Sequence, residues 1–235
     1  MNPKTFADIK AHAEAEFPRE CCGLVTVRKG KEKYLPCRNI SAGTEQFSMH
    51  PEDYAAAEDH GSITMIVHSH PNGSPSPSQA DRVGCEASGL PWLIIGFPSL
   101  ETYEFSPMGY MAPLIGRVFS HGILDCYSLI RDYYRQELRI ELPDFERENE
   151  WWLKGQDLYR ENFKKAGFSP IAVEDLRPHD VILMQISAPK TNHGAVYLGD
   201  GKILHHPMNR LSGRDVFGGF WLKHATVFLR HRSLA

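Results

Sequence analysis

The sequence predicts two folded domains, the first of the α/β class and the second of the α+β class. Residues 1–106 should form a mixed sheet flanked by helices, and residues 117–235 a helix packed on an antiparallel sheet. A chain of 235 residues with average composition is long enough for two domains. Short runs of branched apolar residues indicate buried strands between stretches of helical spacing. Proline and glycine cluster within residues 107–116, which is typical of a linker.

Charge and composition exclude several classes of protein. With 26 basic and 29 acidic residues and a pI of about 6.5, nothing favours nucleic acid or an anionic membrane surface as a partner. No apolar run approaches the ~20 residues that span a bilayer. The N-terminus lacks the basic-then-apolar layout of a signal peptide, so we expect a cytosolic protein. Five cysteines without Cys-x-x-Cys spacing argue against a disulfide framework and a cysteine-bound zinc.

The order of elements in the first half follows from caps, turns and apolar spacing. We expect, in chain order, a helix over 4–16, strands over 23–27 and 33–37, a helix over 51–60, a strand over 63–67, a helix from Ser78 to about Ser88, a strand over 91–97 and an edge strand over 101–106.

The stretch after the third strand carries a set of metal-ligand types. His68 and His70 are two apart on a strand, so their imidazoles point the same way. Turn-forming residues from Pro71 to Gly73 then bring Asp81 round as an oxygen ligand. Two nitrogens and one carboxylate leave a fourth tetrahedral position open, as in a catalytic zinc site.

A purely structural interpretation of the same residues is also open. A His-x-His pair alone is weak evidence, and Ser78-x-x-Asp81 is also the pattern of a capping box. Both interpretations can hold together. A solvated carboxylate is likewise the default for Glu20, which enters the first strand.

The joint pattern is more specific than its parts. His68-Ser-His70-Pro, then Ser78 and Asp81, with Glu20 upstream, resembles the JAMM (MPN-type) metalloprotease family. The resemblance implies one Zn2+ in the N-terminal domain, held by His68, His70 and Asp81. It further implies that Glu20 moves the proton as general base and that Ser78 hydrogen-bonds the oxygen of the intermediate.

The second half places a cysteine at a helix start. The helical pattern begins at Asp125, so Cys126 falls in the first turn, where the helix dipole would lower its pKa from about 8.5. Asp200-Gly201 predicts a hairpin that brings His193 and His205 onto paired strands. By analogy with Cys-His enzymes, His193 would be the base and His205 would orient it. A buried structural cysteine with ordinary strand histidines is the alternative.

These residues stand in a wider pattern. Asp125-Cys126 at a helix start, the run from Leu176 to Met184, and His193-Gly-x-Val-Tyr-Leu-Gly-Asp-Gly together resemble the NlpC-type cysteine peptidases, over roughly residues 112–235. The resemblance implies a papain-like fold and peptidoglycan stem peptides cut between D-glutamate and diaminopimelate.

Two departures from the family pattern leave the substrate open. Leu114–Gly122 replaces the usual Tyr-x-x-Gly-Gly segment, and Tyr127 replaces a serine. Trp151 and Trp152, which are adjacent, are not expected to face one core together, so one of them would line a groove or contact a partner, with partial burial of both as the alternative.

The succession of these two domains resembles the tail tip assembly proteins of lambda-like bacteriophages. It implies other tail tip proteins as partners and peptide or peptidoglycan as substrate. It also implies action in the host cytoplasm during assembly, with the tail tip as a further location. Three functions compete: a two-site peptidase, an assembly chaperone or structural component with non-catalytic sites, and a bacterial cell-wall enzyme or isopeptidase. The third would require a signal peptide.

Overall fold

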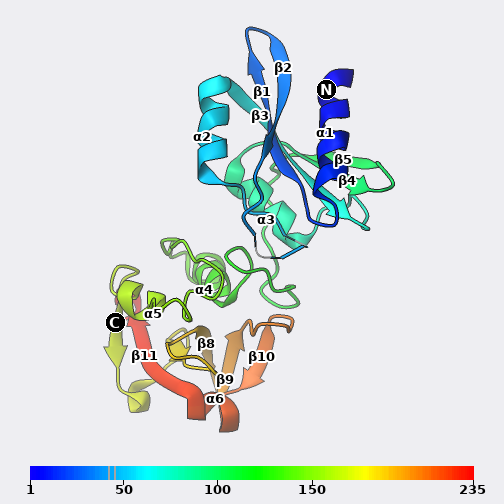
Figure 1. Cartoon of the computed structure of the whole chain (residues 1–235). Coiled ribbons are helices and arrows are strands. Elements are labelled where there is room, and N and C mark those ends of the chain that lie inside the picture. The colour runs from blue at the N-terminus through cyan, green and yellow to red at the C-terminus, as the bar shows by residue number, and fades with distance from the viewer. Residues whose placement is uncertain (42, 45) are drawn as a thin grey trace. The chain divides into compact units, whose positions relative to one another are not determined.

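The computed structural model describes residues 1–41, 43–44 and 46–235, and they form two compact units, Met1–Met111 and Ala112–Ala235 (Figure 1). Each unit has its own sheet and its own hydrophobic core. The division falls inside the predicted linker, while the domain bounds 1–106 and 117–235 stay a prediction. Among the helices of the described residues, none has the length and apolar character that crossing a membrane requires.

The first unit is built on a five-stranded mixed sheet in the order β2-β1-β3-β4-β5. β3 and β4 are parallel, and the other neighbours are antiparallel. The elements are α1 (Pro3–Glu16), β1 (Cys22–Arg28), β2 (Lys31–Cys37), α2 (Pro51–His60), β3 (Ser62–Pro71), α3 (Gln79–Ser88), β4 (Trp92–Phe97) and β5 (Thr102–Phe105).

Helices cover both faces of this sheet, and strands β1 to β3 run between α2 and α1 in Figure 1. On one face Ile9 and Ala13 of α1 pack against Val67 of β3. On the other face Ala57 of α2 and Cys85 of α3 belong to a second cluster with the neighbouring strand positions. Since side chains alternate along a strand, Val67 faces α1 and His68 faces the side of α2 and α3.

The second unit has a six-stranded antiparallel sheet in the order β10-β9-β8-β7-β11-β6. Its elements are α4 (Cys126–Tyr133), a π-helical turn (Tyr134–Leu138), α5 (Leu158–Asn162), β6 (Phe168–Ile171), a 3-10 turn (Val173–Asp175), β7 (Val181–Met184), β8 (His193–Gly199), β9 (Lys202–His205), β10 (Gly213–Val216), α6 (Gly219–His224), β11 (Ala225–His231) and a second 3-10 turn (Arg232–Leu234).

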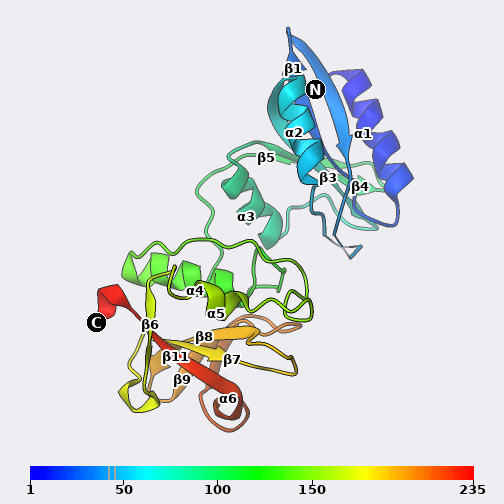
Figure 2. The same ribbon diagram turned by 60° about the vertical axis from the view of Figure 1, so that its left-hand side comes forward.

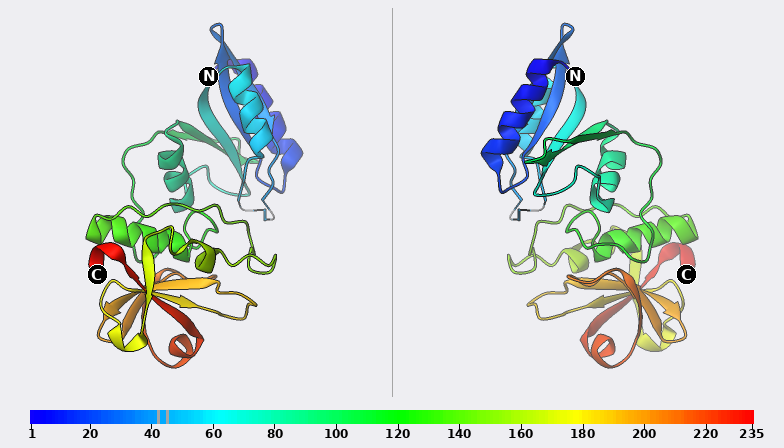
Figure 3. Two further views of the ribbon diagram at one scale, coloured as in Figure 1. Left: turned by 90° about the vertical axis from the view of Figure 1, so that its left-hand side faces the viewer. Right: turned by 90° about the vertical axis from the view of Figure 1, so that its right-hand side faces the viewer.

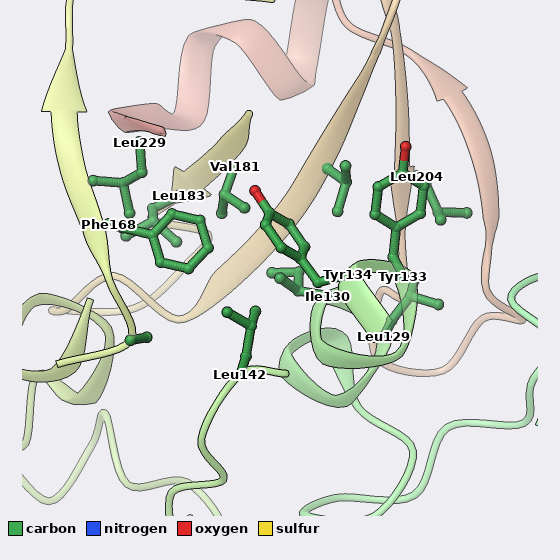
Figure 4. Close-up of a cluster of buried hydrophobic side chains, with 12 residues drawn as sticks. Leu129, Ile130, Tyr133, Tyr134, Leu142, Phe168, Val181, Leu183, Leu204 and Leu229 are labelled. Carbon is green, nitrogen blue, oxygen red and sulfur yellow. The ribbon is translucent and has the colours of Figure 1, made fainter. Parts of the chain in front are cut away.

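α4 lies along one face of this sheet, as Figures 2 and 3 show from different sides. Its apolar residues Leu129, Ile130 and Tyr133 pack against alternate positions of the strands, including Val181 and Leu204 (Figure 4). Burying a side chain of this size contributes about 1.5–3 kcal/mol, so this helix–sheet contact carries much of the unit's stability.

The predicted fold class is confirmed, with a mixed sheet and helices followed by an antiparallel sheet and helix. The helix that starts after Asp125 departs from the prediction, because its α-helical part ends at Tyr133 and Leu138 belongs to a π-helical turn. For the adjacent tryptophans the structure is closer to the alternative in which both are buried. Trp151 and Trp152 are only 2% and 8% exposed, because they lie in a turn and not in a strand or helix with fixed alternation.

Residues on each side of the division are tied to their own unit. The Glu86 carboxylate accepts hydrogen bonds from the backbone N–H groups of Met108 and Tyr110. On the other side, the buried Arg117 guanidinium donates to the carbonyl oxygen of Ala112 and pairs with Asp132 at 2.7 Å. The backbone near Met111 lies between these two anchored stretches.

We expect limited proteolysis to cut within residues 107–116 and to leave two resistant fragments. Few contacts cross a boundary between units, so we expect the cut near Met111, between the two anchored stretches, where the backbone enters a protease site most readily. Mass spectrometry of the fragments would locate the cut. A single resistant fragment that spans residues 107–116 would contradict two separate folding units.

Candidate metal centre and candidate cysteine site

Three predicted metal ligands converge in the first unit. His68 and His70 project from the end of β3, and Asp81 projects from the first turn of α3. The two Nε2 atoms are 3.1 Å apart, and the Asp81 carboxylate oxygens lie 3.2 Å from His68 Nε2 and 3.4 Å from His70 Nε2. All three donors lie within 4.8 Å of one another.

The donor set fits a zinc ion in size and chemistry. Ligands about 2.1 Å from a tetrahedral zinc lie about 3.4 Å from one another, close to the separations found here. His70 Nδ1 lies 2.8 Å from the carbonyl oxygen of Ser74, which can only accept a hydrogen bond. The proton of His70 therefore sits on Nδ1, and the lone pair of Nε2 points to the cluster. His68 is buried, with its ring against Phe47 and Trp92.

Asp81 is held by the start of its own helix. The Ser78 hydroxyl accepts from the Asp81 N–H at 3.1 Å, and the Ser78 N–H donates to Asp81 Oδ2 at 2.7 Å. This is the predicted capping box, and it orients the same carboxylate that faces the histidines. Burial opposes ionisation of Asp81, yet the hydrogen bonds with His68 and His70 hold its pKa well below the usual range.

The register of the sheet places Glu20 beside the cluster. β1 and β3 are antiparallel with Cys22 opposite His68, so continuing the ladder sets Glu20 opposite His70. Directly opposite residues share a face of the sheet. Glu20 is buried. Burial lowers the pKa of His70, but the Asp81 hydrogen bond and, to a smaller extent, the Glu20 charge raise it, and the net effect is a raised pKa.

Ser69, which lies between the two histidines, links β3 to the backbone next to Glu20. Its N–H donates to the Cys21 carbonyl at 3.1 Å, and its hydroxyl accepts from the Cys21 N–H at 2.8 Å. Ser69 faces the opposite side of the sheet from His68 and His70, so it holds the backbone next to Glu20 without entering the cluster.

We expect Ser69→Ala to lower the free energy of unfolding by about 1–3 kcal/mol, because the buried Cys21 N–H loses its acceptor. Chemical denaturation would measure the change. Ser69→Thr, which keeps the hydroxyl, should be closer to the parent. Equal stability of Ser69→Ala and the parent would show that this hydrogen bond does not hold the segment.

In the second unit, Cys126 is the first residue of α4, which begins with a capping box. The Asp125 carboxylate accepts from the Ser128 N–H at 2.8 Å and pairs with the Arg147 guanidinium at 2.8 Å. The Cys126 sulfur lies 3.1 Å from the Tyr159 hydroxyl, and the residue is 9% exposed.

The expected low pKa of Cys126 is wrong for this arrangement. Burial, followed by the negative charge of Asp125, raises the pKa of the Cys126 thiol to about 11. Hydrogen bonds from Tyr159 and from the backbone of Gly194 favour the thiolate but do not outweigh these effects. Burial therefore favours the neutral thiol over the thiolate at this position.

The two predicted histidines are brought together on adjacent strands. His193 Nε2 lies 3.1 Å from His205 Nδ1, and His205 Nε2 lies 3.1 Å from Asp215 Oδ2. Burial and then the neighbouring His205 lower the pKa of His193 to about 3, so its imidazole is neutral. Burial also lowers the pKa of His205, against the opposing effect of Asp215.

Cys126 lies against the backbone next to His193, but among the described residues no direct hydrogen bond joins the two side chains. Among the described residues, the thiol contacts Tyr159 and the backbone of Gly194, which follows His193. Catalytic hydrogen bonds are often longer in ligand-free enzymes, so this geometry leaves His193 available as the base.

Three residues at these sites were not predicted from the sequence. Ser69 could have been found, since it lies between the two histidines on a central strand. Asp215 lies on a short strand, and the sequence does not show which strand pairs with it. Only the observed pairing of β10 with β9 shows that Asp215 reaches His205. Tyr159 lies 33 residues after Cys126, and no sequence signal links the two.

Comparisons with known proteins agree with both motifs. Residues 2–106 match the prokaryotic homologs of the JAB domain, and residues 116–230 match the NlpC/P60 family. Tail tip assembly protein K of Escherichia phage N15 is 40% identical over 239 residues, covering 100% of this chain and 97% of that protein. The protein of the same name from Escherichia phage lambda is 40% identical over 185 residues, covering 79% of this chain and 90% of that protein. The chain therefore belongs to the family of tail tip assembly protein K, with an N-terminal JAB domain and a C-terminal NlpC/P60 domain.

Proposed function

We propose that the chain is a two-site peptidase that acts in phage tail assembly. The convergence of His68, His70 and Asp81 at the spacing of tetrahedral zinc ligands, with Glu20 opposite His70, is the observation that carries the proposal. The hydrogen-bonded His193–His205 pair, with Cys126 against the backbone of Gly194 next to His193, supports a second hydrolytic site.

In the first unit, His68, His70 and Asp81 would hold one Zn2+. When bound, zinc supplies a Lewis acid that activates water toward an amide carbonyl. The buried Glu20 carboxylate takes a proton from the attacking water and passes it to the leaving amine. The hydroxyl hydrogen of Ser78 stays available to donate to the developing oxyanion, since its oxygen is the atom that accepts from the Asp81 N–H.

In the second unit, the Cys126 sulfur attacks the amide carbonyl as its proton passes to His193. His193 then gives that proton to the leaving amine, and a thioester forms on Cys126. Water, deprotonated by His193, attacks the thioester and releases the acid and the thiol. His205 orients the base throughout. The raised pKa of Cys126 means that deprotonation accompanies attack.

We propose tail proteins and peptidoglycan stem peptides as substrates, the latter cut between D-glutamate and diaminopimelate. The relatives are named for tail tip assembly, and so other tail tip proteins are the proposed partners. The proposed location is the host cytoplasm during assembly, with the finished tail tip as a second location.

A second candidate is an assembly chaperone or structural component whose cysteine site does not turn over. The specific observation in its favour is that the Cys126 thiol is buried, has a raised pKa and, among the described residues, is hydrogen-bonded to Tyr159 and not to His193. The two candidates differ in whether any amide bond is cut.

We expect protein purified without chelator to contain about one zinc per chain, and His68→Ala to lose it. Glu20→Gln should keep the metal and lose hydrolysis, because an amide cannot move the proton. Metal analysis and mass spectrometry of tail proteins and peptidoglycan fragments would test both points. Glu14→Gln, the same change on an exposed part of α1, is the control. A zinc-free parent, or a fully active Glu20→Gln, would sink the proposal for this unit.

We expect iodoacetamide to label Cys126 ahead of the four more buried cysteines. The thiolate is the reacting species, so the rate should rise about tenfold per pH unit as the pH approaches the pKa of about 11. Tyr159→Phe should slow labelling about tenfold, because the thiolate loses a hydrogen bond. Peptide mapping would measure the label, with Cys126→Ala as the blank. A rate that levels off near pH 6 would contradict the neutral thiol.

A further inference from the structure

The Asp215 carboxylate ends a row of hydrogen-bonded groups that begins at His193. Its Oδ2 atom lies 3.1 Å from His205 Nε2, and the other nitrogen of His205 lies 3.1 Å from His193 Nε2. His193 and His205 are buried, and the Asp215 side chain is 28% exposed.

Strand pairing places these three side chains on one face of the sheet. On β8 and β9, Ala195 is opposite His205, so His193 is the diagonal neighbour of His205. On β9 and β10, Ile203 is opposite Asp215, so Asp215 is the diagonal neighbour of His205 on its other side. Diagonal neighbours lie within reach of long side chains. The row therefore follows from backbone register across three strands.

The ring of Trp221 restrains both imidazoles. It meets His205 edge-on at 4.3 Å and lies 5.9 Å from His193 between ring centroids. Because the two rings are held in place, the remaining variable is which ring nitrogen of each histidine carries the proton.

We propose that Asp215 is a positioning residue that fixes the tautomers of both histidines and leaves His193 Nδ1 without a proton. An ionised carboxylate only accepts hydrogen bonds, so His205 must carry its proton on Nε2. Neutral His205 then accepts at Nδ1, and the donor is the Nε2–H of His193. The remaining nitrogen of neutral His193 is unprotonated. This inference rests on the proposed role of His193 as the base for Cys126.

The opposite arrangement would disable that base. If His205 carried its proton on Nδ1, it would donate to His193 Nε2, and the proton of His193 would sit on Nδ1. A nitrogen that already carries a proton cannot take one from the thiol. In serine proteases, replacing the orienting aspartate by asparagine similarly leaves the geometry and selects the wrong tautomer. The low pKa of His193 agrees with a neutral ring in both cases.

Arg210 offers a matched control. Its guanidinium lies 3.3 Å from the same Asp215 oxygen and is 57% exposed. Arg210→Gln removes a charged contact of Asp215 while the carboxylate stays next to His205. Asp215→Asn keeps the shape of the side chain but adds a donor, so that either tautomer of His205 can be satisfied.

The test is the tautomer of each histidine in the full chain, measured at neutral pH by long-range 1H–15N correlation after 15N-histidine labelling. The parent and Arg210→Gln should show His193 and His205 protonated on Nε2 alone. Asp215→Asn should lose this single pattern and show protonated Nδ1 at both rings. A parent with the proton on His193 Nδ1, or an Asp215→Asn spectrum equal to the parent, would overturn the inference.

Two further measurements test the inference if Asp215→Asn does not fold and separate it from the proposal that Cys126 is the nucleophile. Asp215→Glu retains an acceptor-only group and should keep the parent pattern, so a mixed pattern there would count against the inference even if Asp215→Asn failed to fold. Labelling of Cys126 in the same samples separates the two proposals. If the tautomers are as expected but the Cys126 thiol of the parent never reacts, the proposal that Cys126 is a nucleophile is wrong and the proposed role of Asp215 still holds.

Discussion

In each unit a capping box at a helix start holds a residue of the candidate site. Asp81 is the third residue of α3 and is fixed by Ser78, and Cys126 is the first residue of α4, which is fixed by Asp125 and Ser128. In both units the cap closes hydrogen bonds that the first turn would otherwise lack. It therefore sets the direction of a side chain whose partners come from a separate strand.

The same helix-start environment has opposite outcomes for the two groups. The dipole at a helix N-terminus is worth about 0.3–1 kcal/mol, and up to about 2 kcal/mol when partly buried. For Asp81 the histidines add to it, and ionisation is favoured. For Cys126, burial and then the Asp125 charge oppose the dipole, and desolvation of a fully buried group can cost up to about 4–7 kcal/mol. Desolvation outweighs the dipole, so a helix-start cysteine is not sufficient for a thiolate.

Local patterns in the sequence predicted the elements and most of the candidate metal centre. Alternation along a strand and a three-residue cap spacing are short-range rules, and they place His68, His70 and Asp81 correctly relative to their own elements. The Asp200-Gly201 turn likewise predicts the pairing of the strands with His193 and His205. Contacts between distant segments follow no such rule. Tyr159 of α5 lies 33 residues from Cys126 in the chain, and burial of the thiol depends on packing that no local pattern records.

Asp81 serves two purposes at once, since one carboxylate both caps the first turn of α3 and faces the histidines. Selection for a well-formed helix alone would preserve it. A descendant without the proposed metal chemistry would have reason to retain Asp81 together with Ser78, whereas nothing in the cap requires Glu20. Drift at Glu20, and not at Asp81, would be the first mark of a lineage that had turned this unit into a scaffold.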